Sequence, residues 1–173
     1  FNDDISGWDV SGVINMSEMF SGATSFNQPL SAWNPKTVTN MSSMFEGATS
    51  YNQNMDSWNA ALATNMSKMF KGATAFNGTV SGWEVSQVEN MSEMFFGATS
   101  FDKPLTNWNT STALINIDGM FRNASSFNQS VSHITTSEVT NLGNVFYGAT
   151  LFNQDITNWV TNKATTMKNM FRE

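Results

Sequence analysis

The sequence predicts an α/β repeat solenoid of about seven turns, with short parallel strands on one face and short helices on the other. One observation behind this prediction is that a unit of 25 residues recurs along the whole 173-residue chain. The other is that each unit carries apolar residues at fixed places, one set of which has the spacing of a helix face. Repetition at this period is typical of chains whose units stack to share one core.

The repeat units each begin at an aromatic residue, and together they form one predicted domain. They span residues 1–25, 26–50, 51–75, 76–100, 101–126, 127–151 and 152–173. The fifth unit has one inserted residue and the seventh stops before its Gly-Ala segment, so we expect a fragment of a longer repeat protein. Positions within a unit are counted from its first residue, and the fifth unit is aligned on Asn116 as position 15.

Positions 5 and 8 are predicted to point into the core from a short strand. Position 5 is aliphatic or Met in every unit, and position 8 is Trp in all units but the sixth, which has Ile134. Segments such as "DDISGW" and "QPLSAW" would pair in parallel with their equivalents in neighbouring units. We expect the Trp side chains to stack internally, each indole N–H bonding a carbonyl or water, rather than to form a carbohydrate-binding surface.

Positions 15 to 22 predict a short helix. Met16, Met19 and Phe20 have the i, i+3, i+4 spacing of one helix face, and the other units repeat this pattern. Asn15 is suited to cap the helix through its side-chain oxygen, and Gly22 is suited to end it in the left-handed conformation. So short a helix is unstable alone, so neighbouring units must hold it. We assign the Met side chains to the core rather than to a soft-metal site.

Composition disfavours several classes of function. The net charge is −6 with no basic stripe, which argues against nucleic acid as a partner. No apolar run approaches the length of a membrane span. The chain has no Cys and only one histidine, His133, so disulfides, thiolate metal sites and His clusters are excluded. We expect no cofactor, no metal and no enzymatic activity; an enzyme would need a pocket around His133.

Two sets of surface residues are candidate partner-binding sites. Position 6 is a ladder of small polar residues: Ser6, Ser31, Asp56, Ser81, Thr106, Ser132 and Thr157. It lacks the aromatic and Arg anchors of tight interfaces, so a partner would depend on contacts with many turns. Phe96 and Tyr147 occupy position 21, where other units have Ser, Glu, Lys or Arg, and we expect them to contact a neighbouring copy.

Several asparagines fit the Asn-x-Ser/Thr sequence of N-glycosylation sites. Those at position 15 are expected to be occupied as caps. The better candidates for glycosylation are Asn77, Asn109, Asn123 and Asn128.

The repeat resembles that of the BspA-like leucine-rich-repeat family, including the bacterial surface-protein and Mycoplasma-lipoprotein type. The resemblance rests on "FNQDITNW" at 152–159 and "NMSEMFFGATSF" at 90–101, and it covers essentially the whole chain. The departures are Ile134, Gly143, Val145 and the insertion before Asn116. The resemblance implies a leucine-rich-repeat-like solenoid that is exposed at a cell surface or secreted, and it implies no catalytic residues.

The function expected on these grounds is a non-catalytic scaffold for adhesion or protein–protein contact. Its partner would be a protein or a ligand on a host or neighbouring cell. The alternative is a structural subunit of an extracellular filament or surface layer. Neither terminal unit provides a polar cap, so end faces of neighbouring molecules are expected to stack head to tail if no further repeats cover them.

Overall fold

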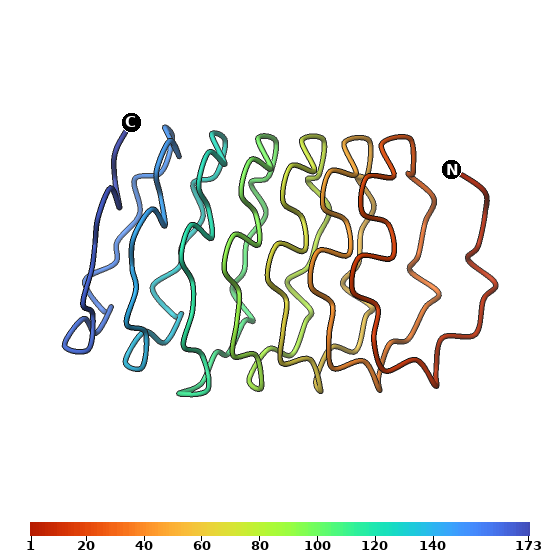
Figure 1. The fold of residues 1–173 in the computed structure, drawn as a ribbon, viewed down its shortest axis with the longest axis horizontal. Helices are drawn as coiled ribbons and strands as arrows, with labels where there is room; N and C mark the ends of the chain where they lie inside the picture. Colours follow the sequence, from red (N-terminus) through yellow and green to blue (C-terminus); the bar gives the residue numbers. More distant parts are fainter.

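The computed structural model describes all of residues 1–173 as a stack of coils, with the two termini at opposite ends (Figure 1). It contains no helix, and its only strand pairing consists of isolated parallel bridges between neighbouring coils. These bridges join Asn15 to Asn40, Asn40 to Asn65, Asn65 to Asn90, Asn90 to Asn116 and Asn141 to Thr166. The predicted α/β, leucine-rich-repeat-like solenoid with helices and strands is therefore wrong, because turns and extended segments make up each coil.

Hydrogen bonds between coils replace the helix predicted at positions 15 to 22. Alternate backbone N–H groups of this segment donate to carbonyls of the following coil. In the second coil they join Met41 to Asn65, Ser43 to Ser67, Phe45 to Met69 and Gly47 to Lys71, at N···O distances of 2.7 to 2.9 Å. An α-helix would need the same N–H groups for carbonyls four residues earlier in the chain.

Left-handed residues also prevent a helix in this segment. Position 18 has a positive φ in every coil, at Glu18, Ser43, Lys68, Glu93, Gly119, Asn144 and Asn169. A right-handed helix does not pass through a left-handed residue. The segment is instead a run of tight turns, such as the one closed by the Glu46 N–H and the Ser43 carbonyl at 3.1 Å. Position 22 is left-handed too, with φ of 71° at Gly22, which confirms that part of the prediction.

The segment around position 5 is a turn rather than a strand. The Trp58 N–H donates to the Met55 carbonyl at 3.1 Å, and equivalent bonds recur in the other coils. Met55 is nevertheless buried, as are most residues at position 5. The inward direction of these side chains was therefore predicted correctly, whereas the strand was not.

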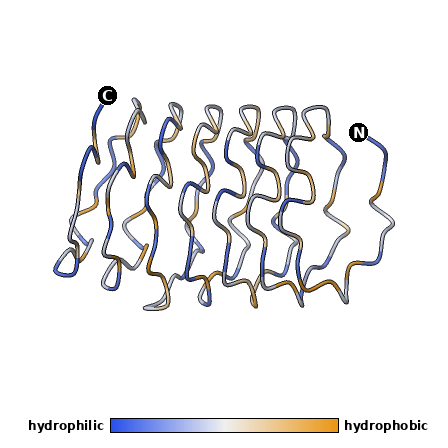
Figure 2. Cartoon of the chain, viewed as in Figure 1, coloured by the Kyte–Doolittle hydropathy of each residue, from blue (hydrophilic) through white to orange (hydrophobic).

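The core is filled by columns of side chains that run along the stack, and Figure 2 shows hydrophobic residues recurring at equivalent places of successive coils. The rings at position 20 stack face to face on the rings at position 1 of the following unit, with centroids 3.8 to 4.2 Å apart. They also stack along the column, as Phe45 does on Phe70 at 5.5 Å. These two columns form an aromatic spine that only stacked coils can build.

The Trp side chains at position 8 form a second buried column. Trp33, Trp58, Trp83 and Trp108 are buried, and successive rings lie 6.2 to 6.3 Å apart. The Trp58 Nε1–H donates to the Leu30 carbonyl of the preceding coil at 2.8 Å, and other coils repeat this bond. The predicted internal stack with a carbonyl partner is confirmed.

Replacing Gly72 by Ala tests the left-handed turn at position 22. Gly72 has a φ of 69°, while a Cβ there would meet only backbone of Gly47 at an ordinary 3.8 Å. We expect a loss of about 1–2 kcal/mol in the free energy of unfolding, caused by conformation alone. Gly12→Ala is the control, since Gly12 has no left-handed backbone and open space around it. Equal stability of both variants in urea titrations would contradict the assignment.

Replacing Tyr51 by Phe tests the packing of the spine. The Tyr51 hydroxyl is buried and has no hydrogen-bond partner, and its burial raises the pKa of that hydroxyl far above the usual value. An unpaired buried hydroxyl costs about 1–3 kcal/mol, so we expect Tyr51→Phe to be more stable than the parent chain. Thermal unfolding provides the measurement. A lower midpoint would mean that the hydroxyl has a partner.

Candidate functional site

A ladder of asparagine side chains joins the coils along one edge, and sequence analysis missed it. We call it the asparagine ladder; its members are Asn2, Asn27, Asn52, Asn77, Asp102, Asn128 and Asn153. Each side-chain oxygen accepts the backbone N–H of the next member, as Asn27 Oδ1 does from Asn52 at 2.9 Å. The signal was present in the sequence, because position 2 is Asn in every unit but one.

The asparagines at position 15 behave partly as predicted. Asn40 Oδ1 accepts the N–H of Ser42 at 3.0 Å, and the other coils repeat this bond. It closes a turn through the residue two places on, rather than capping a helix. The oxygen is thus occupied as expected, in a different local structure.

The four glycosylation candidates lie in three different settings. Asn77 and Asn128 belong to the asparagine ladder, where their side-chain oxygens are hydrogen-bonded. Asn123 has a left-handed backbone with φ of 56°. Asn109 is exposed. Glycosylation at these residues stays a prediction. Among the four candidates, Asn109 is the most accessible.

The residues at position 6 form a row on the outside of a turn. All seven are exposed or half-buried, and in one neighbouring pair the Ser81 hydroxyl donates to Asp56 Oδ1 at 3.3 Å. At both ends of the row an aspartate two places earlier fixes the backbone: Asp4 accepts the N–H of Ser6, and Asp155 that of Thr157. These bonds hold the pKa of both aspartates below the usual value. The row therefore presents small hydroxyls and one carboxylate at a repeated spacing.

Position 21 forms a stripe in which cations and aromatic rings alternate. We call it the cation–aromatic stripe; its members are Lys71, Phe96, Arg122, Tyr147 and Arg172. The Arg122 guanidinium carbon lies 5.1 Å from the Phe96 ring centroid and 4.8 Å from that of Tyr147. Lys71 lies 5.2 Å from the Phe96 ring, and Arg172 lies 5.8 Å from the Tyr147 ring. The two aromatic residues singled out from the sequence are thus covered in part by their own neighbours.

The charges of the stripe are balanced at one end only. Lys71 Nζ lies 2.7 Å from Glu93 and 3.9 Å from Glu46. Arg122 has no carboxylate partner, and its Nε is buried without a hydrogen bond. The two rings therefore provide the main contacts of the Arg122 guanidinium.

His133 follows Ser132 of the row at position 6 and is half-buried. Its Nε2 is buried without a hydrogen-bond partner. The structure places no hydroxyl or carboxylate in hydrogen-bond contact with this nitrogen.

A hollow of about 500 Å³ lies between the fifth and sixth coils. Here the bridge between Asn116 and Asn141 is missing, and the Ile117 N–H does not reach the next coil. The hollow is lined by Ile115, Asn116, Asp118, Glu138, Thr140 and Asn141. The inserted residue of the fifth unit lies just before Asn116 in the sequence, beside this hollow. Glu138 in the lining forms an ion pair with Lys163.

Comparison with known proteins identifies the family. The chain matches the family model described as "Mycoplasma protein of unknown function, DUF285" twice, over residues 1–83 and 64–173. The chain therefore belongs to this family and is a repeat protein. No curated protein and no solved structure matches it. No helix in the structure has the length and hydrophobicity to cross a membrane.

A double-mutant cycle tests the cation–aromatic stripe. We expect Phe96→Leu and Arg122→Gln to show a coupling of about 0.5–1 kcal/mol in unfolding free energy, because each removes the same contact. Pairing Phe96→Leu with Lys36→Gln provides the control, since Lys36 lies outside the stripe. Additive effects in the first cycle would show that the stripe contributes no interaction energy.

Proposed function

We propose that the chain is a non-catalytic scaffold that mediates adhesion or protein–protein contact outside the cell or at its surface. The observation that carries this proposal is the filling of the coil interior by stacked side chains, which leaves the outer positions as the repeated polar surface. The resemblance of the repeat to BspA-like surface proteins supports the same location and role. We propose this BspA-like relationship as a finer placement within the matched family.

The row at position 6 is the proposed contact surface. Its hydroxyls recur on successive coils, and none is an anchor of the kind that dominates a compact interface. Binding would therefore be weak for each coil and would gain strength from many coils acting together. A protein or another ligand on a neighbouring cell that itself repeats suits such a surface.

A second candidate function is a subunit of an extracellular filament or surface layer. The observation in its favour is that the junctions between internal coils repeat one set of backbone hydrogen bonds and ring contacts, which a junction between two solenoids would use again. Stacking of ends would extend the columns from one molecule to the next. Such an assembly is open, because head-to-tail contacts need not close into a ring.

Adhesion of coated beads tests the first candidate. Beads carrying the chain are compared on cultured epithelial monolayers with beads carrying the triple variant Ser31→Lys, Ser81→Lys, Thr106→Lys. We expect several-fold fewer adherent beads for the variant, because bulky cations interrupt the row at position 6.

The matched control adds the same charge elsewhere. Asn34→Lys, Gln87→Lys and Thr112→Lys lie at exposed positions outside the row, and beads carrying this variant should adhere like the parent. Thermal unfolding establishes that each protein is folded. Parent beads that adhere no better than uncoated beads would overturn the proposed role, and equal loss in both variants would overturn the assigned surface.

A further inference from the structure

The hollow between the fifth and sixth coils lies where two bonds of the inter-coil ladder are missing. In the five other junctions, the N–H at position 14 donates to the position 14 carbonyl of the preceding coil. The N–H at position 16 donates there to the position 15 carbonyl of the following coil, and both bonds measure 2.8 to 3.0 Å. Neither forms between the fifth and sixth coils. This leaves the N–H groups of Ile117 and Thr140 and the carbonyls of Ile115 and Asn141 without a backbone partner.

The break in the ladder is local. Further along the same junction, the Gly119 N–H donates to the Gly143 carbonyl at 3.2 Å, and the Phe121 N–H donates to the Val145 carbonyl at 2.9 Å. The rings of Phe121 and Phe146 are stacked, with centroids 5.8 Å apart. The core is therefore continuous across this junction, and the opening is confined to the segment that follows the inserted residue.

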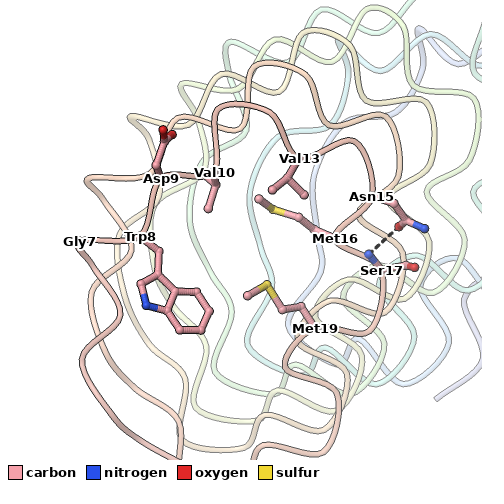
Figure 3. A pocket seen from close by; sticks show the side chains of 9 residues that line it. All are labelled: Gly7, Trp8, Asp9, Val10, Val13, Asn15, Met16, Ser17 and Met19. Carbon is pink, nitrogen blue, oxygen red and sulfur yellow. Dashed lines mark hydrogen bonds between the residues drawn. The ribbon is translucent and has the colours of Figure 1, made fainter.

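The amide side chains beside the hollow are already engaged in turns. Asn116 and Asn141 each use Oδ1 to accept the N–H two residues further on, at 3.0 and 2.7 Å. The first coil has the same turn, in which the Asn15 side chain points toward the N–H of Ser17 (Figure 3). Neither amide oxygen of the hollow is thus free to replace the missing bonds of the backbone.

The other side chains of the hollow give it a negative charge and one apolar surface. Asp118 forms no ion pair, and its Oδ1 has only a long contact of 3.4 Å with the Asn144 side-chain amide. Glu138 is neutralised by Lys163. Ile115 is 52% exposed. An unpaired carboxylate and an exposed aliphatic side chain therefore lie beside the four unpaired backbone groups.

We infer that this hollow binds an extended peptide segment of a partner protein, and that the segment carries a Lys or Arg side chain. In the other junctions the same four groups are paired with backbone N–H and C=O groups, and an extended peptide supplies both kinds. The cation of the segment would pair with Asp118, and a neighbouring apolar side chain would pack on Ile115. The inference rests on the proposed role in protein–protein contact and specifies a partner segment for it.

Fluorescence anisotropy with a fluorescein-labelled peptide, TKVKT, tests the inference. This peptide combines β-branched residues, which favour an extended backbone, with two cations. We expect saturable binding to the parent chain. Binding should weaken about fivefold or more when every peptide N–H is methylated, because the backbone donors are lost. No binding of TKVKT, or equal binding of its methylated form, would overturn the inference.

Replacing Asp118 by Asn tests the contribution of the carboxylate. This variant should bind TKVKT about fivefold more weakly but bind the neutral peptide TQVQT like the parent, because only the charged peptide forms a charge-assisted bond. Glu84→Gln is the matched control, since Glu84 is an exposed acid that does not line the hollow. It should bind TKVKT like the parent. Equal loss in both variants would mean that the acidic chain attracts the peptide without a site.

Amide exchange measured by NMR locates the bound peptide. In the parent chain the Thr140 and Ile117 amides should exchange faster than their equivalents Thr64 and Met66, which are hydrogen-bonded to neighbouring coils. Added TKVKT should slow the exchange of Thr140 and Ile117. Binding without such slowing would place the peptide elsewhere and overturn the inference.

Deletion of Thr112 closes the hollow if the insertion is what opens it. Thr112 is exposed and lies in the segment lengthened by the insertion. We expect the deletion to protect the Thr140 amide and to abolish binding of TKVKT; a protected amide with full binding would overturn the inference. If the deletion variant does not fold, amide exchange in the parent chain decides. Parent beads that adhere although no peptide binds would overturn this inference and leave the proposed function intact.

Discussion

The fold depends on one constraint, which is that alternate N–H groups of each coil must find carbonyls on the next coil. Once Phe45 donates to Met69 and Ser43 to Ser67, those groups are no longer free for a helix. The left-handed backbone at position 18 recurs in every coil and is incompatible with a right-handed helix, so it is consistent with bonds that run between coils. The turns within a coil and the bonds between coils are therefore parts of one hydrogen-bonding scheme.

The same constraint aligns every other column. Coils held in register place Phe on Phe, Trp over Trp and asparagine beside asparagine, so side-chain contacts between coils reinforce the backbone bonds. It also turns each outer position into a row, which is how isolated Ser and Thr residues become an extended surface. The cation–aromatic stripe arises in this way, because Phe96 and Arg122 are 26 residues apart in sequence but adjacent in space.

Sequence analysis identified the repeat, its inward positions and the internal Trp stack, because burial imposes the same residue type on every unit. The local structure of positions 15 to 22 was misassigned, since a ribbon of turns can place Met41, Met44 and Phe45 inward just as a helix does. Glu18, Ser43 and Lys68 gave no sign of a left-handed backbone, and only Gly119 and two asparagines at the same position suggested it.

The candidate surfaces were predictable to different degrees. The row at position 6 follows from the repeat alone, and its exposure agrees with the prediction of a surface ladder. The cation–aromatic stripe at position 21 could not be predicted from the repeat. The contact of Arg122 with two rings depends on the spacing between coils rather than on neighbours in the sequence. The hollow beside Asn116 likewise depends on how one inserted residue disturbs the backbone pairing between the fifth and sixth coils.

Through-hydrogen-bond scalar couplings in solution NMR test the inter-coil ladder most directly, since each coupling identifies the carbonyl that accepts a given N–H. The structure predicts couplings from the amides of Met41, Ser43 and Phe45 to the carbonyls of Asn65, Ser67 and Met69. A coupling from the Phe45 amide to the Met41 carbonyl, four residues earlier, would instead establish a helix and contradict the account.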